Sequence, residues 1–433
     1  MEEKLAILGG KPVFNNKLPI TNNIGDEEKK AVMRVMDRGI LSGFVARWDE
    51  RFYGSIEVKN FEKNFGDKFG VKHAVSFNSA TTALHGAIAA AGIGPGDEVI
   101  TSPYTMSATP SSVLMNQAVP IFADIDEKTF CLDPDDVEKK ITSRTKAILT
   151  VNLFGHPSDF DKLLSIAEKH NLILIEDNAQ SPGAIYNNKI TGSIGHMGVF
   201  SYNFHKTMQC GEGGVLITNN DNYAFRAQLL RNHGEVVVDE MDDNDARKQS
   251  TILLGNNYRL SELHAAISNE QLKKLEFLTE ERIKLANYLT EKLKKIPGLI
   301  PAYVQDGCKH VYYVYPIKFD SKVWGVPRSV FAKALKAEGA PITEGYVKPL
   351  YLIPMYQRLN VYNKTSYPFN LCNRDASSYS KGICPVVERM YEKELLLTNI
   401  CRYPLTKEHI DLFISAIEKI YANKSQLKDI KND

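Results

Sequence analysis

Short apolar runs alternate with helical patterns along the first half of the chain. Apolar residues at positions 32, 33, 35, 36 and 40 follow a helical period that ends near Gly39. From residue 72 to residue 220, short apolar strands are separated by helical or loop stretches, which predicts a largely parallel sheet with helices on both faces. The expected strands read KHAVSFN, EVITS, VPIFADI, AILTVNLFG, LILIEDN, MGVFSYN and GVLITNN.

A very long helical pattern marks the expected change from one domain to the next. It covers residues 259–296 and predicts a helix pair or a kinked connector. At 433 residues, the chain is also longer than one compact core usually grows. We therefore expect a large domain over residues 1–290 and a smaller C-terminal α/β domain over residues 291–433. Residues 41–57 and the acidic residues 237–250 lack a period, so we expect both to be loops.

Charge and cysteine usage exclude several classes of protein. The net charge is +1, from 53 basic and 52 acidic residues, which gives no argument for binding nucleic acid or an anionic membrane. No apolar run approaches the ~20 residues of a membrane span, and the N-terminus has acidic residues where a secretory signal has lysines. Six cysteines lie far apart without a CxxC pair, so neither a metal site nor a disulfide framework is indicated. We expect a soluble cytoplasmic protein.

Candidate ligand-binding residues follow the ends of the expected strands, where doubly wound sheets bind their ligands. Ser79, Ala80 and Thr81 come after the first strand and open a helix. Free N–H groups and hydroxyls at a helix start suit a phosphate, although a simple helix cap also explains Ser79. Asp177 ends a later strand, where a buried carboxylate needs a partner. Two roles suit Asp177 at this position: it caps the next helix, or it pairs with a protonated ring nitrogen.

Lys206 lies in SYNFHKTMQCGEGG, between an aromatic run and a glycine-rich turn. A lysine in such surroundings can lose its proton near neutral pH, as an imine-forming amine must. Most lysines, however, are solvated surface charges. A phosphate cradle, a strand-end aspartate and a lysine, in this order on an α/β sheet, are together what pyridoxal 5'-phosphate (PLP) needs. The carboxylate keeps the pyridine protonated, and the lysine forms the Schiff base.

Many segments resemble the DegT/DnrJ/StrS family of sugar aminotransferases, PLP enzymes of fold type I. They include GIGPGDEVITSPYTMSAT, ILIEDNAQSPGA, FSYNFHKTMQCGEGGVLITN, RNHG and NNYRLSELHAAISNEQLKKLE, in the order of the family. The resemblance is clear from about residue 6 to about residue 285 and weaker towards the C-terminus. It implies an α/β fold type I transferase, with a large PLP-binding domain and a smaller C-terminal domain.

The resemblance also implies roles for single residues around the cofactor ring. Lys206 matches the Schiff-base lysine, five residues before the glycine run, and is the implied catalytic residue. Asp177 matches the partner of the pyridine nitrogen. Gln180 matches the residue beside the phenolic oxygen of the cofactor, and Tyr104 matches the aromatic side chain that stacks on its ring.

Further matches concern the phosphate group. Ser201 matches a hydroxyl that contacts the phosphate. Asn257 matches an asparagine that reaches the phosphate of the neighbouring subunit, which implies a homodimer with shared active sites. The phosphate turn usually reads Ser-Gly-Thr in the family, whereas here it is Ser79-Ala80-Thr81. Because alanine keeps the N–H donor, we expect phosphate binding to survive with a slightly shifted backbone.

Two more features bear on the reaction. Dehydratases of the family carry histidine in place of the lysine, and His205 precedes Lys206 here. The spacing to the glycines nevertheless puts Lys206 in the lysine position, which favours transamination. Residues 45–55 resemble an insertion, which is either a lid over the substrate or a surface loop.

The implied function is the transfer of an amino group from glutamate or glutamine to a nucleotide-linked keto-sugar or a keto-cyclitol. LAILGGKPVF and CPVVERMYEKELLL resemble the branch of the family that acts on cyclitol and amino-shikimate-type ketones. The alternatives are a PLP-dependent sugar dehydratase and an inactive regulator that keeps the fold. Lys206, Asp177 and Gln180, all present, argue against the inactive regulator.

Overall fold

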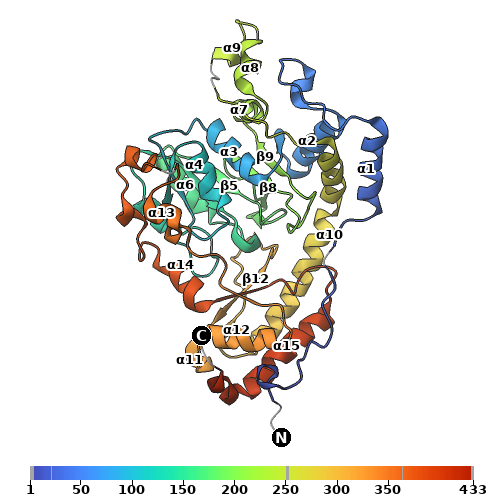
Figure 1. The fold of residues 1–433 in the computed structure, drawn as a ribbon, viewed down its shortest axis with the longest axis vertical. Helices are drawn as coiled ribbons and strands as arrows, with labels where there is room; N and C mark the ends of the chain where they lie inside the picture. Colours follow the sequence, from blue (N-terminus) through green and yellow to red (C-terminus); the bar gives the residue numbers. More distant parts are fainter. Residues whose placement is uncertain (1–3, 21, 250–252, 363, 431–433) are drawn as a thin grey trace.

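The computed structural model describes residues 4–20, 22–249, 253–362 and 364–430 and is built around a seven-stranded sheet (Figure 1). Five neighbouring strands are parallel, and only β9 runs antiparallel to its neighbours β1 and β8. All the strands expected between residues 72 and 220 form, and the mostly parallel sheet is confirmed. The strand order is β1 (His73–Phe77), β9 (Gly214–Thr218), β8 (Met197–Ser201), β5 (Ile173–Asp177), β4 (Thr145–Val151), β2 (Glu98–Thr101) and β3 (Val119–Phe122).

Helices bury both faces of this sheet. Ile148 and Leu149 are neighbours on β4 and belong to two different apolar clusters, because successive side chains of a strand point to opposite faces. The small residues of α3 allow a close approach to the sheet, since a Cβ atom at Gly86 would lie 2.7 Å from the Phe77 ring. The helices that follow the strands are α3 (Ala80–Ala90), α4 (Ala108–Met115), α5 (Pro134–Lys139), α6 (Phe160–Lys169) and α7 (Asp221–Arg231).

The long helical pattern forms one continuous helix, α10 (Glu262–Leu293), and not a helix pair or a kinked connector. It has no Pro or Gly that would break it. Its first half packs against α1 (Asp26–Arg38) and α2 (Ile56–Phe69). From Leu285 onward it belongs to the apolar cluster of the C-terminal part, and it runs along one side of the molecule (Figure 1).

The C-terminal part is a four-stranded antiparallel sheet covered by helices. Leu5 and Phe14 of the N-terminal segment pack into its apolar cluster. The sheet order is β10 (Leu299–Ile300), β12 (Tyr315–Phe319), β14 (Leu395–Thr398) and β13 (Thr343–Glu344). The helices that pack into this cluster are α11 (Ser321–Trp324), α12 (Arg328–Ala337) and α15 (Lys407–Ala422). Two short helices of the C-terminal part, α13 (Pro354–Arg358) and α14 (Pro385–Arg389), instead pack into the apolar cluster of the large sheet. A small third sheet contains β6 (Ile185–Tyr186), β7 (Lys189–Ile190) and β11 (Cys308–Lys309).

The prediction of a loop over residues 237–250 is wrong at residues 237–239, which belong to α8 (Gly234–Asp239), and at α9 (Ala246–Gln249); Ser250 lies outside the described residues. Val237, in α8, and Met241, just past the end of this helix, are buried in the same apolar cluster, although acidic residues surround them in the sequence. Their cluster includes Phe52, from the segment 45–55, which is fully buried. This segment therefore docks on α7 and α8, which lie at one end of the molecule (Figure 1).

Candidate active site

A cavity of about 180 Å³ lies at the carboxyl ends of β5 and β8. Asp177 and Ser201 are the last residues of these two parallel neighbours, so their side chains reach the same edge of the sheet. The structure brings most of the predicted site residues together here. The predicted residues that line the cavity are Ser79, Ala80, Thr81, Asp177, Gln180, Ser201 and Lys206.

The turn between β1 and α3 has the geometry of an anion cradle. Ser79 is the N-cap of α3, and its Oγ accepts the N–H of Thr82 at 3.2 Å, so the simple capping role is present too. Ala80 and Thr81 begin the helix, where N–H groups have no partner within the helix. At Gly214 a Cβ atom would lie 2.4 Å from the Ser79 backbone, so this glycine lets β9 approach the cradle.

Asp177 is buried, and its carboxylate accepts hydrogen bonds from two neighbouring groups. Its Oδ2 accepts the Thr109 hydroxyl at 2.7 Å, and its Oδ1 accepts the N–H of Ala179 at 3.2 Å. Burial raises the pKa of Asp177, against the hydrogen bonds and the charge of Lys206, which lower it. A cation in the cavity would stabilise the charged carboxylate. Thr109 was not predicted, because its hydroxyl reaches Asp177 only through the packing of α4 on the sheet.

Lys206 follows β8 in a tight turn, in which its N–H donates to the carbonyl of Asn203 at 2.9 Å. Its Nζ lies 4.7 Å from the centre of the Tyr313 ring. Burial lowers the pKa of Lys206 to about 8; Arg402 also lowers it, and Asp177 raises it. The lowered pKa makes the neutral amine, the form that a nucleophile requires, easier to reach near neutral pH, although the charged form still predominates at pH 7.

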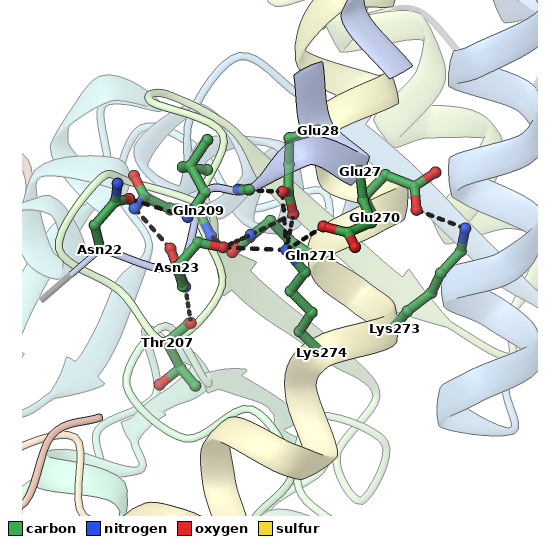
Figure 2. Close-up of polar contacts among 12 residues, drawn as sticks. Asn22, Asn23, Glu27, Glu28, Thr207, Gln209, Glu270, Gln271, Lys273 and Lys274 are labelled. Atoms are coloured by element: carbon green, nitrogen blue, oxygen red, sulfur yellow. Dashed lines mark hydrogen bonds and ion pairs between the residues drawn. The ribbon is translucent and has the colours of Figure 1, made fainter. Parts of the chain in front are cut away.

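A polar network holds the loop after Lys206 in place, as Figure 2 shows. Asn23 donates to the carbonyl of Thr207 at 3.0 Å and accepts from Gln209 at 2.8 Å. Gln271, on α10, donates to the carbonyl of Asn23 at 3.0 Å and to Glu28 at 2.8 Å. The N-terminal segment and α10 thus clamp the residue next to the lysine, a connection that sequence patterns do not indicate.

Gln180 and Tyr104 are both joined to Tyr346, a cavity-lining residue that the sequence did not single out. Gln180 donates to the Tyr346 hydroxyl at 3.1 Å and accepts the N–H of Phe154 at 2.9 Å. Tyr104 accepts the N–H of Tyr346 with its hydroxyl at 3.0 Å. Its side chain is fully buried and does not line the cavity, so Tyr104 supports Tyr346 in this chain.

Asn257 does not line the cavity of its own chain. It is exposed, and its Oδ1 accepts from Nε of Arg259 at 2.7 Å. Its predicted contact with the phosphate of a partner subunit remains a prediction.

The residues present fit PLP. Helix-start donors with hydroxyls match its phosphate, a buried carboxylate matches its ring nitrogen, and a lysine of lowered pKa matches its aldehyde. All three groups face one cavity. The fold and the site therefore define a PLP-dependent enzyme of fold type I.

Comparison with known proteins identifies the family. The profile of the DegT/DnrJ/EryC1/StrS aminotransferase family matches residues 47–390, and the chain belongs to this family. It is 37% identical to GDP-perosamine synthase from Caulobacter vibrioides, over 70% of this chain and 79% of that protein. It is 35% identical to L-glutamine:scyllo-inosose aminotransferase from Streptomyces griseus, over 81% and 82%. The chain is therefore a PLP-dependent aminotransferase.

Solved structures have the same fold. S. venezuelae DesV, in complex with a ketimine intermediate, superposes with a TM-score of 0.76 at 28% identity, over 92% of this chain and 94% of that one. GDP-4-keto-6-deoxymannose-3-dehydratase (ColD) superposes with a TM-score of 0.76 at 27% identity, over 93% and 100%. Across the described residues, every helix is too short or too polar to cross a bilayer.

Proposed function

We propose that the chain transfers the amino group of glutamate or glutamine to a nucleotide-linked keto-sugar or a keto-cyclitol. Such a reaction serves amino-sugar, polysaccharide or secondary-metabolite biosynthesis. The observation that carries the proposal is Lys206, with its pKa lowered to about 8, in one cavity with the buried Asp177. The two relatives reported above, an aminotransferase for an inosose and a synthase for an amino sugar, support both substrate classes.

Each residue of the cavity would have a distinct role. Ser79, Ala80, Thr81 and Ser201 would hold the phosphate of PLP, with Asn257 of a partner subunit completing that site in a homodimer. Asp177 would keep the ring nitrogen protonated, and Gln180 would lie beside the phenolic oxygen. Tyr104 would support the ring through Tyr346, to which it is hydrogen-bonded, and not by direct stacking.

PLP, when bound, supplies an electron sink for the negative charge that develops at the reacting carbon. Lys206 would do the work of moving the proton. Its Nζ would take the proton from the substrate carbon as a general base and return it at the aldehyde carbon of the cofactor as a general acid. A pKa near the working pH suits both steps.

A sugar dehydratase is the second candidate, because ColD shares the fold. A lysine at position 206 favours transamination, since the dehydratases that this chain resembles use histidine there.

A cytoplasmic location fits the six cysteines, all of which are free.

Purified protein loaded with PLP tests these roles. Nucleotide-linked keto-sugars and keto-cyclitols are incubated with glutamate or glutamine, and the products are weighed by mass spectrometry. Gain of an amine with wild-type protein, and none with Lys206→Ala, is the expected result. Loss of water from the substrate without gain of nitrogen would assign the chain to the dehydratases. No reaction with any ketone, from protein that holds PLP, would overturn the proposal.

A further inference from the structure

A second and smaller cavity meets the PLP cavity at Lys206, which lines both. Its volume is about 30 Å³. It lies where α10, the loop after Lys206 and the segment before α15 come together. The remaining residues that line it are Asn23, Phe204, Thr207, Gln209, Leu278, Arg282, Arg402 and Tyr403.

Two arginines give this small cavity a positive charge. Arg282, on α10, is 4% exposed; one of its Nη atoms donates to the Thr207 hydroxyl at 3.0 Å, and its Nε has no hydrogen-bond partner in the structure. Arg402 donates to the carbonyl of His205. Within the described part of the chain, no carboxylate forms an ion pair with either guanidinium.

Burying these guanidinium groups without a counter-charge destabilises the folded protein unless an anion binds beside them. Burial, helped by the charge of Arg402, lowers the pKa of Arg282 to about 9, and burial lowers the pKa of Arg402 as well. Both side chains remain charged at neutral pH. Lys206 lines the same cavity, which adds a third cationic group when it is protonated. Buried charges of one sign require a compensating partner, and a guanidinium with a free N–H is an anion receptor.

We propose that Arg282 and Arg402 bind the carboxylate of the amino donor and turn its amino group towards Lys206. The inference rests on the proposed function. An α-amino acid carries its carboxylate and its amino group on the same carbon, so a carboxylate held here places the nitrogen at the boundary between the two cavities. The small volume favours a single carboxylate over a diphosphate, because about 30 Å³ has room for roughly two water-sized groups, at ~10–15 Å³ each, and a carboxylate has two oxygens. A planar guanidinium matches a carboxylate by two parallel hydrogen bonds.

Binding of glutarate, a dicarboxylate without an amino group, tests the site in PLP-loaded protein. Arg282→Met and Arg402→Met are each expected to weaken glutarate binding, measured by calorimetry, by about tenfold or more. Arg34→Met is the matched control, because Arg34 lies on the surface of α1 with its side chain 52% exposed. Neutral glutaramide should bind none of these proteins. Glutarate bound equally well by wild type and Arg402→Met would overturn the proposal, even if Arg282→Met fails to fold.

Two more measurements distinguish a donor carboxylate from an acceptor phosphate, and distinguish failure of this proposal from failure of the proposed function. If the arginine variants lose affinity for uridine diphosphate and keep it for glutarate, the site serves the phosphates of the acceptor and the proposal is overturned. In turnover, the variants should raise KM for the donor and leave KM for the keto acceptor unchanged. Loss of glutarate binding in the variants, combined with no amine product from wild type, overturns the proposed function and leaves the anion site standing. Amine formation by wild type, with a donor KM that the arginine variants leave unchanged, overturns the proposed anion site and leaves the proposed function standing.

Discussion

Replacing Lys206 by methionine should make the cofactor-free protein more stable. Burial and Arg402 lower the pKa of this lysine from 10.5 to about 8, so the folded state disfavours the charged amine. The difference corresponds to about 3 kcal/mol of unfolding free energy at pH 7, where the amine is charged in both states. Methionine removes this cost and keeps an unbranched side chain. Loss of the cation–π contact with Tyr313 offsets roughly 1 kcal/mol, which leaves a net gain of about 2 kcal/mol.

The sign of the pH dependence follows from the same pKa. Between about pH 8 and pH 10.5 the unfolded chain holds a proton on Lys206 that the folded chain has lost, so wild-type stability rises with pH in this window. The advantage of Lys206→Met should therefore shrink on going from pH 7 to about pH 9.5. Urea unfolding of the two cofactor-free proteins at both pH values measures it, with Lys30→Met, at an exposed position on α1, as a control that should change stability by no more than about 0.5 kcal/mol. An advantage that is absent at pH 7, or that does not depend on pH, would refute the reasoning.

Three further changes test other parts of the structure. Asp177→Asn should keep part of the PLP and lower kcat about a hundredfold or more, measured by steady-state kinetics, because an amide cannot hold the ring nitrogen protonated. A near-normal rate would leave Asp177 with only its hydrogen bonds to Thr109 and Ala179, since no helix begins in the described residues between β5 and β6 for it to cap. Co-expressed chains carrying Lys206→Ala and Asn257→Asp should recover part of the activity in purified mixed dimers, whereas no recovery would mean that each site is built from one chain. Phe52→Ala should cost about 3 kcal/mol or more of stability with little change in kcat, because Phe52 is fully buried against α7 and α8; a large loss of kcat in folded protein would instead support a lid.

The positions of the main reactive groups could be predicted because they depend on local pattern. Alternating apolar strands and helices predict a parallel sheet, and residues at the carboxyl ends of its strands share one edge. Asp177 and Ser201 end β5 and β8, and Ser79 follows β1, so all three lie at the cavity as expected. Lys206 follows β8 in the chain, and the family resemblance, through its spacing to the glycines, places it beside them.

Side chains that meet across long stretches of chain could not be predicted in this way. Thr109 binds Asp177, and Tyr346 joins Gln180 from the C-terminal part, yet neither position has a distinctive sequence pattern. The burial of Tyr104 is equally a matter of what packs around it.

The sequence by itself indicated the class of fold through its short-range periodicity, and it indicated the cofactor and the proposed Schiff-base lysine through the order of three local motifs together with the family resemblance. Only the tertiary structure decided how acidic or basic these groups are and what surrounds them. The pKa of Lys206 depends on burial and on Arg402, which lies almost two hundred residues away along the chain. Burial and charge proximity are properties of the packed molecule, so no local pattern encodes them.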